Sequence, residues 1–431
     1  MSGRPAPATR ASRGEELAAR FDEVRSATCR LAEPLSAEDC AAQSMPEASP
    51  IGWQLAHTTW FFETFLLAQA IPGHRPFHPQ YGFLFNSYYN AIGERVARPL
   101  RGRMTRPGLE EILEYRRHVD AQVRALLERA DEALLLRHGP VLELGWNHEQ
   151  QHQELMLTDL KHLFSLNPLE PAYRAGPHPG AATAPAARFL RREGGLHSIG
   201  HAGTGFAFDH EAPRHRVYTH PFEIASRPVT NGEFLRFVEE GGYESPDPWL
   251  SDGWDWVVAE RIRAPAYWKR EDGAWRIFTL RGTRDLDLDE PVAHVSYYEA
   301  DAYARWVGAR LPREDEWELA ASEVPVDGNF VESGALHPRP VAVAAGGELA
   351  APAGLFGDVW EWTQSPYVAY PGFSASPGAL GEYNGKFMSN RMVLRGGSCV
   401  SPRSHLRASY RNFFAPGARW QFSGFRLARD V

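Results

Sequence analysis

The spacing of apolar residues changes once along the chain, and this change limits the folds that the sequence can adopt. Up to about residue 167, apolar residues recur three and four positions apart, which is the period of an amphipathic helix. Early examples are Leu17, Phe21, Val24 and Leu31. From about residue 190, apolar runs are short and Gly and Trp are frequent. The first part is therefore expected to be helical and the second to be rich in loops and short strands.

The length of the chain also indicates more than one domain, because 431 residues exceed what one hydrophobic core usually supports. The sequence predicts an α+β multidomain protein. Its expected parts are a disordered leader (1–14), a helical bundle (15–167), a linker rich in Pro, Ala and Gly (168–189) and a loop-rich α+β domain (190–431).

Individual helices can be placed from their periodicity and their start signals. Pro50 precedes an apolar stretch, and proline is favoured at the start of a helix. In the first domain we expect helices from about residue 15, over 51–70, over 109–127, and from Gly145 through Leu163. Four principal helices make a four-helix bundle. In the second domain, helices are expected over 231–239, 296–306 and 313–321.

Charge and cysteine usage exclude several classes of protein. The net charge of −8 and a pI near 6.1 do not favour a nucleic-acid partner or an anionic membrane. The three cysteines lack CxxC spacing, so we expect no disulfide framework. The N-terminal stretch has no apolar core of a signal peptide, and no apolar run approaches a membrane span. These features predict a cytoplasmic protein, and they leave its oligomeric state, including a homo-oligomer, open.

Two histidines stand four residues apart in the helical stretch that begins at Gly145. His148 and His152 therefore share one helix face and can close on a single ion. His57 has a similar helical setting upstream. Imidazole is the commonest metal ligand, and three of them from two helices of a bundle make a transition-metal site. The sequence therefore predicts a metal site formed by His57, His148 and His152.

The same stretch also reads H-E-x-x-H, the motif of zinc peptidases, in which Glu149 would be the general base. Glu170 could be offered as a third zinc ligand, but it follows Pro168 in the expected linker. The glycine and histidine of the extended motif are absent, since Leu155 and Thr158 stand there. A metallopeptidase is a distant alternative, and so is a non-catalytic metal-binding protein.

The second domain resembles a known family. The words that carry the resemblance are Phe206–Glu211, Pro228–Asn231, Leu311–Glu318, Gly357–Thr363, Leu394–Ser398 and Gly424–Ala428. They are similar to those of the formylglycine-generating-enzyme (sulfatase-modifying-factor) fold, a C-type-lectin-like α+β fold. True formylglycine generators use a cysteine pair in this region, where only Cys399 stands, so that activity is not expected.

The first domain resembles the DinB-type four-helix bundle, which carries the same three-histidine pattern. Its most diagnostic words are Trp53–Glu63 and His148–His152. The two domains in this order resemble the ergothioneine sulfoxide synthases (the EgtB family), and the resemblance covers essentially the whole chain. It implies that His57, His148 and His152 hold a non-haem Fe(II), and that O2 is a co-substrate. The implied reaction joins a thiol to imidazole carbon 2 of hercynine (N-α-trimethylhistidine) and leaves a sulfoxide.

The resemblance also implies roles for other residues. Gln151 matches a residue that hydrogen-bonds the substrate imidazole, and Asn412 one near the hercynine head group. Arg98 and Arg101 match a pair that grips the carboxylate of the thiol substrate, for which an arginine fork is well suited.

The identity of the thiol substrate depends on two departures from the actinobacterial branch. Relatives that use γ-glutamylcysteine have Trp-Asp where this chain has Phe413-Phe414. Tyr88-Tyr89 resembles the tandem tyrosine of the branch that takes free cysteine. We therefore expect cysteine as thiol donor and Tyr88 or Tyr89 as the catalytic proton donor. The alternatives are γ-glutamylcysteine as donor, or an ovothiol-type coupling of cysteine with histidine itself.

Overall fold

The computed structural model describes residues 12–176, 182–203, 205–342, 349–375, 378–382 and 384–431. The chain forms two compact units. The first contains the described residues up to Ser87 together with Ile92–Gln153, and the second contains Tyr88–Ala91 and Glu154–Val431. Over the described residues, no helix combines the length and the apolar composition that crossing a membrane requires.

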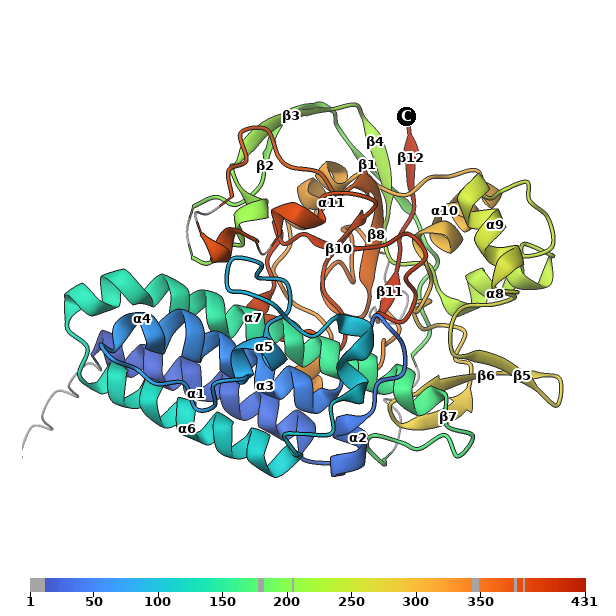
Figure 1. Ribbon diagram of the computed structural model, residues 1–431. Helices are drawn as coiled ribbons and strands as arrows, with labels where there is room; N and C mark the ends of the chain where they lie inside the picture. The colour runs from blue at the N-terminus through green and yellow to red at the C-terminus, as the bar shows by residue number, and fades with distance from the viewer. Residues whose placement is uncertain (1–11, 177–181, 204, 343–348, 376–377, 383) are drawn as a thin grey trace, which may run out of the picture. The chain divides into compact units, whose positions relative to one another are not determined.

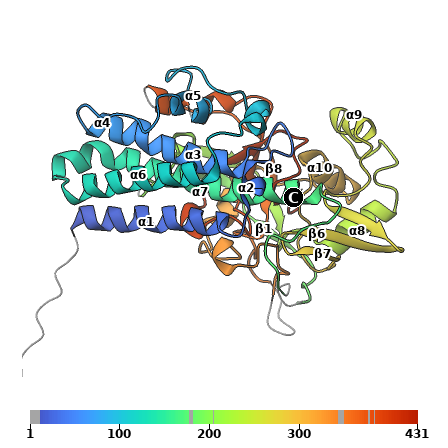
Figure 2. The same ribbon diagram turned by 60° about the horizontal axis from the view of Figure 1, so that its bottom comes forward.

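Four long helices lie side by side in the first unit (Figures 1 and 2). They are α1 (Arg13–Ala32), α3 (Ile51–Phe61), α6 (Leu109–Glu128) and α7 (Glu132–Ser165), of which the last continues into the second unit. The π-helix η1 (Phe62–Leu67) and α4 (Ala68–Ala70) extend α3. Shorter elements are α2 (Ala37–Ala41), α5 (Tyr81–Phe85) and the 3-10 helix η2 (Arg98–Arg103). The predicted four-helix bundle is thus confirmed.

Two phenylalanine rings pack closely against α7 because residue 145 of that helix is a glycine. A Cβ atom built at Gly145 would lie 2.4 Å from Cε1 of Phe62 and 3.1 Å from Cε1 of Phe61. Both phenylalanines are fully buried, and Phe62 makes an edge contact with Phe21 of α1 at 5.0 Å. Because no side chain intervenes, α7 can approach α3 closely one turn before His148.

Two helix boundaries differ from expectation. The helix predicted from Gly145 begins earlier, at Glu132, and Pro140 lies inside it. Proline normally breaks a helix because it lacks the N–H donor and its ring clashes with the preceding turn. The helix predicted over residues 51–70 is continuous but contains the π-helical turn η1, a feature often found near functional sites. The predicted leader lies mostly on residues 1–11, outside the described residues, and α1 begins at Arg13 after an N-cap at Ser12.

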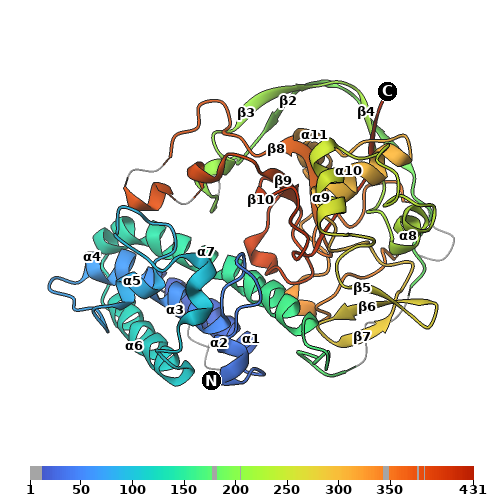
Figure 3. The ribbon, with the colours of Figure 1, turned by 45° about the vertical axis from the view of Figure 1, so that its right-hand side comes forward.

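Over the residues that the structure describes, the second unit contains four small sheets. The central sheet has the order β10-β9-β8-β11, in which β8 and β11 are parallel and the other neighbours antiparallel. Its strands are β8 (Trp360–Pro366), β9 (Met392–Arg395), β10 (Asn412–Phe414) and β11 (Ser423–Gly424). Figure 3 shows it in the middle of the unit, next to α10 (Tyr297–Trp306) and α11 (Glu314–Ala321).

Three further sheets surround this centre. Strand β4 lies between β1 and β12, β2 pairs with β3, and β6 lies between β5 and β7. The bounds are β1 (Phe189–Arg192), β2 (Gly195–Ile199), β3 (His215–Thr219), β4 (Phe222–Ala225), β5 (Trp268–Glu271), β6 (Ala274–Thr279), β7 (Gly282–Asp285) and β12 (Ala428–Asp430). Single turns of 3-10 helix are η3 (Asp209–Glu211), η4 (Val331–Ser333), η5 (Ala379–Glu382), η6 (Gly385–Phe387) and η7 (Arg403–His405).

The helices of this unit follow their start signals. Thr230 and Ser296 cap α8 (Asn231–Glu239) and α10 with capping boxes, and both helices were predicted, as was α11. The sequence did not predict α9 (Ser251–Ala259), because Leu250 at its N-cap makes no side-chain cap and gives no start signal. The predicted linker, residues 168–189, includes 177–181 outside the described residues, and the domain limits stay a prediction.

Candidate metal centre and other predicted site residues

Three histidines from α3 and α7 converge inside the first unit. One nitrogen of each of His57, His148 and His152 lies within 4.8 Å of the corresponding nitrogens of the other two. The Nε2 atoms of His57 and His148 are 3.2 Å apart. His57 and His148 are buried and His152 is half-buried. The sequence predicted this cluster from the four-residue spacing of His148 and His152 on α7 and from the similar helical setting of His57.

Two of the rings are oriented by hydrogen bonds through their other nitrogen. Nδ1 of His57 lies 2.6 Å from the carbonyl oxygen of Phe85, and Nδ1 of His152 lies 3.1 Å from Oε1 of Gln54. An N–H donated from Nδ1 leaves the lone pair on Nε2, so these partners select the tautomer that can bind a metal. Gln54 and Phe85 were not predicted, because neither residue type is a signal for this role.

The surroundings keep the three imidazoles neutral. Burial lowers the pKa of His148 to about 3, and it lowers the pKa values of His57 and His152 well below their ordinary range. The positive charges of Arg101 and Arg98 lower the last two further. Neutral imidazole is the ligand form that divalent iron, zinc or copper binds. The donor set therefore fits a transition-metal ion held by three histidines.

Arg101 is linked to His57 through an aromatic ring. The rings of Trp53 and His57 are stacked, with centroids 4.6 Å apart, and Cζ of Arg101 lies 3.4 Å from the Trp53 ring centroid. The Arg101 guanidinium also donates to Oγ of Ser49 at 2.8 Å and to Oγ of Ser87 at 3.0 Å. Arg101 is thus buried and held in place beside the candidate metal ligand.

Arg98 and Arg101 both lie on η2, and Arg101 lines a cavity. The cavity has a volume of about 300 Å³, and Trp53, Phe85 and Arg101 are among the residues that line it. The side chain of Arg98 is exposed, and its carbonyl accepts a hydrogen bond from Nε2 of Gln43 at 2.9 Å. Gln151 lies on α7 between His148 and His152 and is half-buried.

Glu149 is not available as the general base of a peptidase. Its carboxylate accepts hydrogen bonds from Arg25 (2.8 Å), Thr28 (2.6 Å) and Arg116, and it is completely buried. Burial alone would raise the pKa of Glu149, but the two arginines outweigh this effect and lower it to about 2. Glu170, the other acid of the peptidase alternative, lies beyond the end of α7 and bonds to Thr283 and Lys269. The geometry thus contradicts a zinc peptidase site.

Tyr88 and Tyr89 belong to the second unit, where both have aromatic neighbours. The two tyrosine rings are 4.9 Å apart, and the ring of Tyr88 makes an edge contact with Phe387 at 5.4 Å. Lys386 donates to the carbonyl oxygen of Tyr88, and its Nζ lies 5.0 Å from the Tyr88 ring centroid. Tyr89 is completely buried.

Asn412, Phe413 and Phe414 form strand β10 and are all half-buried. The strand pairs antiparallel with β9, opposite Leu394, Val393 and Met392. Phe413 stacks on Tyr367 with ring centroids 4.1 Å apart, and Phe414 makes an edge contact with Trp420 at 5.8 Å. The three residues therefore present one amide and two aromatic rings from a short, well-supported strand.

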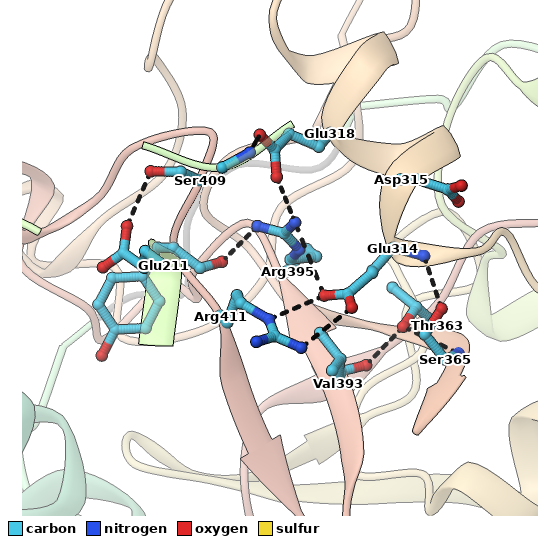
Figure 4. A network of polar contacts seen from close by, with 12 residues as sticks. Glu211, Glu314, Asp315, Glu318, Thr363, Ser365, Val393, Arg395, Ser409 and Arg411 are labelled. Atoms are coloured by element: carbon cyan, nitrogen blue, oxygen red, sulfur yellow. Dashed lines mark hydrogen bonds and ion pairs between the residues drawn. The ribbon is translucent and has the colours of Figure 1, made fainter. Parts of the chain in front are cut away.

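A buried ion-pair network anchors the start of β10 to α11. Arg411, directly before the strand, makes two hydrogen bonds of 3.0 Å to the carboxylate of Glu314 on α11. It also donates to the carbonyl oxygen of His210. Figure 4 shows this pair, with Arg395 bonded to Glu318 beside it. The sequence did not predict the network, since the partners are far apart in the chain.

Both parts of the chain match known domain families. Residues 20–156 match the DinB superfamily, and residues 177–347 and 352–431 match the sulfatase-modifying factor enzyme 1-like domain. The fold and the histidine cluster thus define a two-domain class, in which a DinB-type bundle with a candidate metal site precedes a sulfatase-modifying-factor domain.

Individual relatives narrow this class. The chain is 33% identical over 436 residues to a hercynine oxygenase of Mycobacterium tuberculosis, covering 97% of this chain and 99% of that protein. It is 34% identical over 441 residues to a hercynine oxygenase of Mycolicibacterium thermoresistibile, covering 96% and 95%. Ergothioneine biosynthesis protein 1 of Schizosaccharomyces pombe is 28% identical over 238 residues, covering 52% of this chain and 28% of that protein. The chain belongs to the hercynine oxygenase (EgtB) family, which confirms the resemblance expected from its sequence.

Proposed function

We propose that the protein is an oxygenase of ergothioneine biosynthesis that joins imidazole carbon 2 of hercynine to the sulfur of cysteine, giving hercynylcysteine sulfoxide. The reaction balances with one O2, because one oxygen atom enters the sulfoxide and the other leaves as water with the hydrogens of carbon 2 and the thiol. Membership of the hercynine oxygenase family over nearly the whole chain supports this activity. The observation that carries it is the convergence of His57, His148 and His152.

The residues that would hold the metal are these three histidines, and we propose that the ion is Fe(II). Three neutral ligands would leave coordination positions for other molecules and would keep the site cationic, which favours binding of a thiolate. When bound, Fe(II) supplies the redox chemistry for O2. Hydrogen bonds from the His57 and His152 rings to Phe85 and Gln54 keep the ligand nitrogens aimed at one point.

Charged side chains would recognise the thiol substrate, and amide and aromatic side chains would recognise hercynine. Arg101 lines a cavity that Trp53 and Phe85 also line, and a guanidinium group such as that of Arg101 or Arg98 suits the carboxylate of the thiol substrate. Gln151 would hydrogen-bond the hercynine imidazole. Asn412 and the rings of Phe413 and Phe414 would receive the trimethylammonium group, since aromatic faces attract quaternary ammonium ions.

Uncharged residues support cysteine over γ-glutamylcysteine as the thiol substrate. Phe413 and Phe414 offer no acid to interact with the second amino acid of γ-glutamylcysteine. Tyr88 or Tyr89 would donate the proton during the reaction, and the complete burial of Tyr89 supports a role away from bulk water.

The test is anaerobic reconstitution with Fe(II), followed by hercynine, one thiol and O2, with products weighed by mass spectrometry. We expect hercynylcysteine sulfoxide from free cysteine. Product from γ-glutamylcysteine alone would keep the reaction class but contradict the assignment of the thiol donor. A parallel reaction with histidine in place of hercynine tests the ovothiol-type alternative, and faster coupling of histidine would favour it. No product with any pair would refute the proposal.

A further inference from the structure

Glu149 is the centre of a buried polar layer to which all four long helices of the first unit contribute. Arg25 and Thr28 on α1 and Arg116 on α6 donate directly to its carboxylate. Arg25 also donates through Nε to Oδ1 of Asp120 on α6, at 2.7 Å. The two arginines and two acids balance in charge, and Glu149 itself is completely buried.

The layer reaches α3 beside the first candidate ligand. Nη2 of Arg25 donates to Oγ1 of Thr59 at 2.9 Å, and Nη1 of Arg116 donates to Oγ1 of Thr58 at 3.3 Å. Thr58 follows His57 directly, just as Glu149 follows His148. Thr58 and Glu149, each the residue after a histidine, therefore both accept a hydrogen bond from Arg116.

Such a layer restricts helix rotation more strongly than apolar contacts do. Successive residues of a helix point about 100° apart, so a turn of α7 that moved His148 would also move Glu149 away from its donors. Apolar side chains can repack after a small rotation, but a buried carboxylate and guanidinium that lose each other remain uncompensated in a low dielectric. One rotation of α7 is thus strongly preferred.

We propose that Glu149 is a positioning residue for the metal centre, which fixes the rotation of α7 against α1, α3 and α6 and so directs His148 and His152 towards His57. This role rests on the proposed function only in requiring that the three histidines bind a metal ion. It assigns the acidic residue of the H-E-x-x-H stretch to the alignment of ligands instead of proton transfer.

The test is anaerobic titration of the metal-free full chain with Co(II), followed by its visible d–d absorption, which reports ligand geometry. In Glu149→Gln the side-chain shape is kept but the charge that holds both arginines is lost. We expect Co(II) affinity to fall about 10- to 100-fold, the usual cost of losing a partner behind a metal ligand. The absorption bands should also shift, which general destabilisation of a folded protein would not cause.

A matched control is Glu63→Gln. Glu63 is also a buried acid of this bundle and accepts hydrogen bonds from Tyr115 on α6 and from the backbone of Phe77. We expect this variant to melt at a lower temperature with unchanged Co(II) affinity and spectrum. An equal loss of affinity in Glu63→Gln would overturn the inference, because it would trace the effect to stability alone.

Thr28→Val keeps the inference testable if Glu149→Gln does not fold. It removes one hydroxyl that donates to Glu149 and preserves the shape of the side chain. A weaker Co(II) affinity in folded Thr28→Val supports the positioning role, whereas wild-type affinity and spectrum in the folded variants overturn it. Wild-type protein that binds no Co(II) would instead overturn the proposed metal centre, and this role with it.

Discussion

The Nε2 atoms of His57 and His148 lie 3.2 Å apart, although 91 positions separate the two residues in the chain. Their rings are nearly perpendicular, with an interplanar angle of 89°, so the two imidazoles are not stacked on each other. Burial keeps both imidazoles neutral. A cation shared by these two nitrogens would satisfy both of them, and the proposed metal centre takes His152 as its third ligand.

Replacing a ligand should remove the metal without unfolding the bundle. We expect His57→Ala to lower metal affinity by more than the roughly 10- to 100-fold typical of losing a residue that hydrogen-bonds a metal ligand. Metal content after dialysis, with circular dichroism for the fold, measures this. His138→Ala is the control, since His138 lies on α7 but outside the cluster. Full metal content in His57→Ala would contradict the assignment.

Loss of Arg411 should strongly destabilise the second unit. Arg411→Met leaves the buried carboxylate of Glu314 without its bidentate partner, and removing one member of a buried pair typically costs about 3–5 kcal/mol. The free energy of unfolding in urea measures the loss. The exposed pair Arg191–Glu193, at 2.9 Å, provides the control, and Arg191→Met should cost no more than about 1 kcal/mol. Equal effects of the two variants would refute this interpretation.

The same substitution tests the role of β10 in substrate binding. Because Arg411 directly precedes Asn412, its loss should disturb the strand expected to contact hercynine. In variant protein that remains folded, we predict that KM for hercynine rises more than KM for cysteine. A uniform fall in kcat with both KM values unchanged would contradict a role of this strand in hercynine recognition.

Lys161 should make stability depend on pH. Burial lowers its pKa from about 10.5 to about 7. Between these values the unfolded chain binds more protons than the folded protein, so this contribution to stability rises as pH increases from 7 towards 10. The groups that face Lys161 are His294, Tyr267, Cys399, Arg284 and Glu290. These groups also titrate in a Lys161→Met variant, so the free energy of unfolding of that variant serves as the reference.

The measurement is the free energy of unfolding of wild type and Lys161→Met at pH 7, 8 and 9. The wild-type value relative to the variant should increase with pH by at most about 1.4 kcal/mol per pH unit, the equivalent of one proton. A difference that stays constant or decreases over this range would show that Lys161 remains charged in the folded protein.

Phenylalanine variants test the proposal that Tyr88 or Tyr89 is the proton donor. Tyr88→Phe and Tyr89→Phe each remove one hydroxyl and keep the ring packing between the two side chains. General-acid catalysis typically contributes about 100- to 10,000-fold, so one of the variants should lose that much of its coupling rate while still binding hercynine. Single-turnover kinetics measure the rate. Wild-type rates in both variants would remove the tyrosine pair from the mechanism.

The histidine cluster could be predicted because its signal is local. His148 and His152 share a helix face by spacing alone, and His57 has a similar helical setting. The groups that orient these rings could not be predicted in the same way. Gln54 and the carbonyl of Phe85 have no distinctive sequence signal, and their role depends on how α3, α5 and α7 pack.

The other contacts that the sequence did not predict are ion pairs between residues far apart in the chain. The H-E-x-x-H motif indicated Glu149 as a catalytic base. In the structure its carboxylate is instead bound by Arg25 and Arg116, which are 124 and 33 positions away. Arg411 and Glu314 are 97 positions apart. Helix periodicity gives the exposed and buried faces of each element, whereas the pairing of buried charges is decided only when the elements pack together.

The most direct test of the central claim compares wild type with His57→Ala in one aerobic assay. Both proteins receive Fe(II), hercynine and cysteine, and the coupled product is quantified by mass spectrometry alongside bound iron. We predict one iron per chain and hercynylcysteine sulfoxide for the wild type, and neither for the folded variant. Product formed by His57→Ala at the wild-type rate, or an iron-loaded wild type that forms no coupled product, would contradict the account.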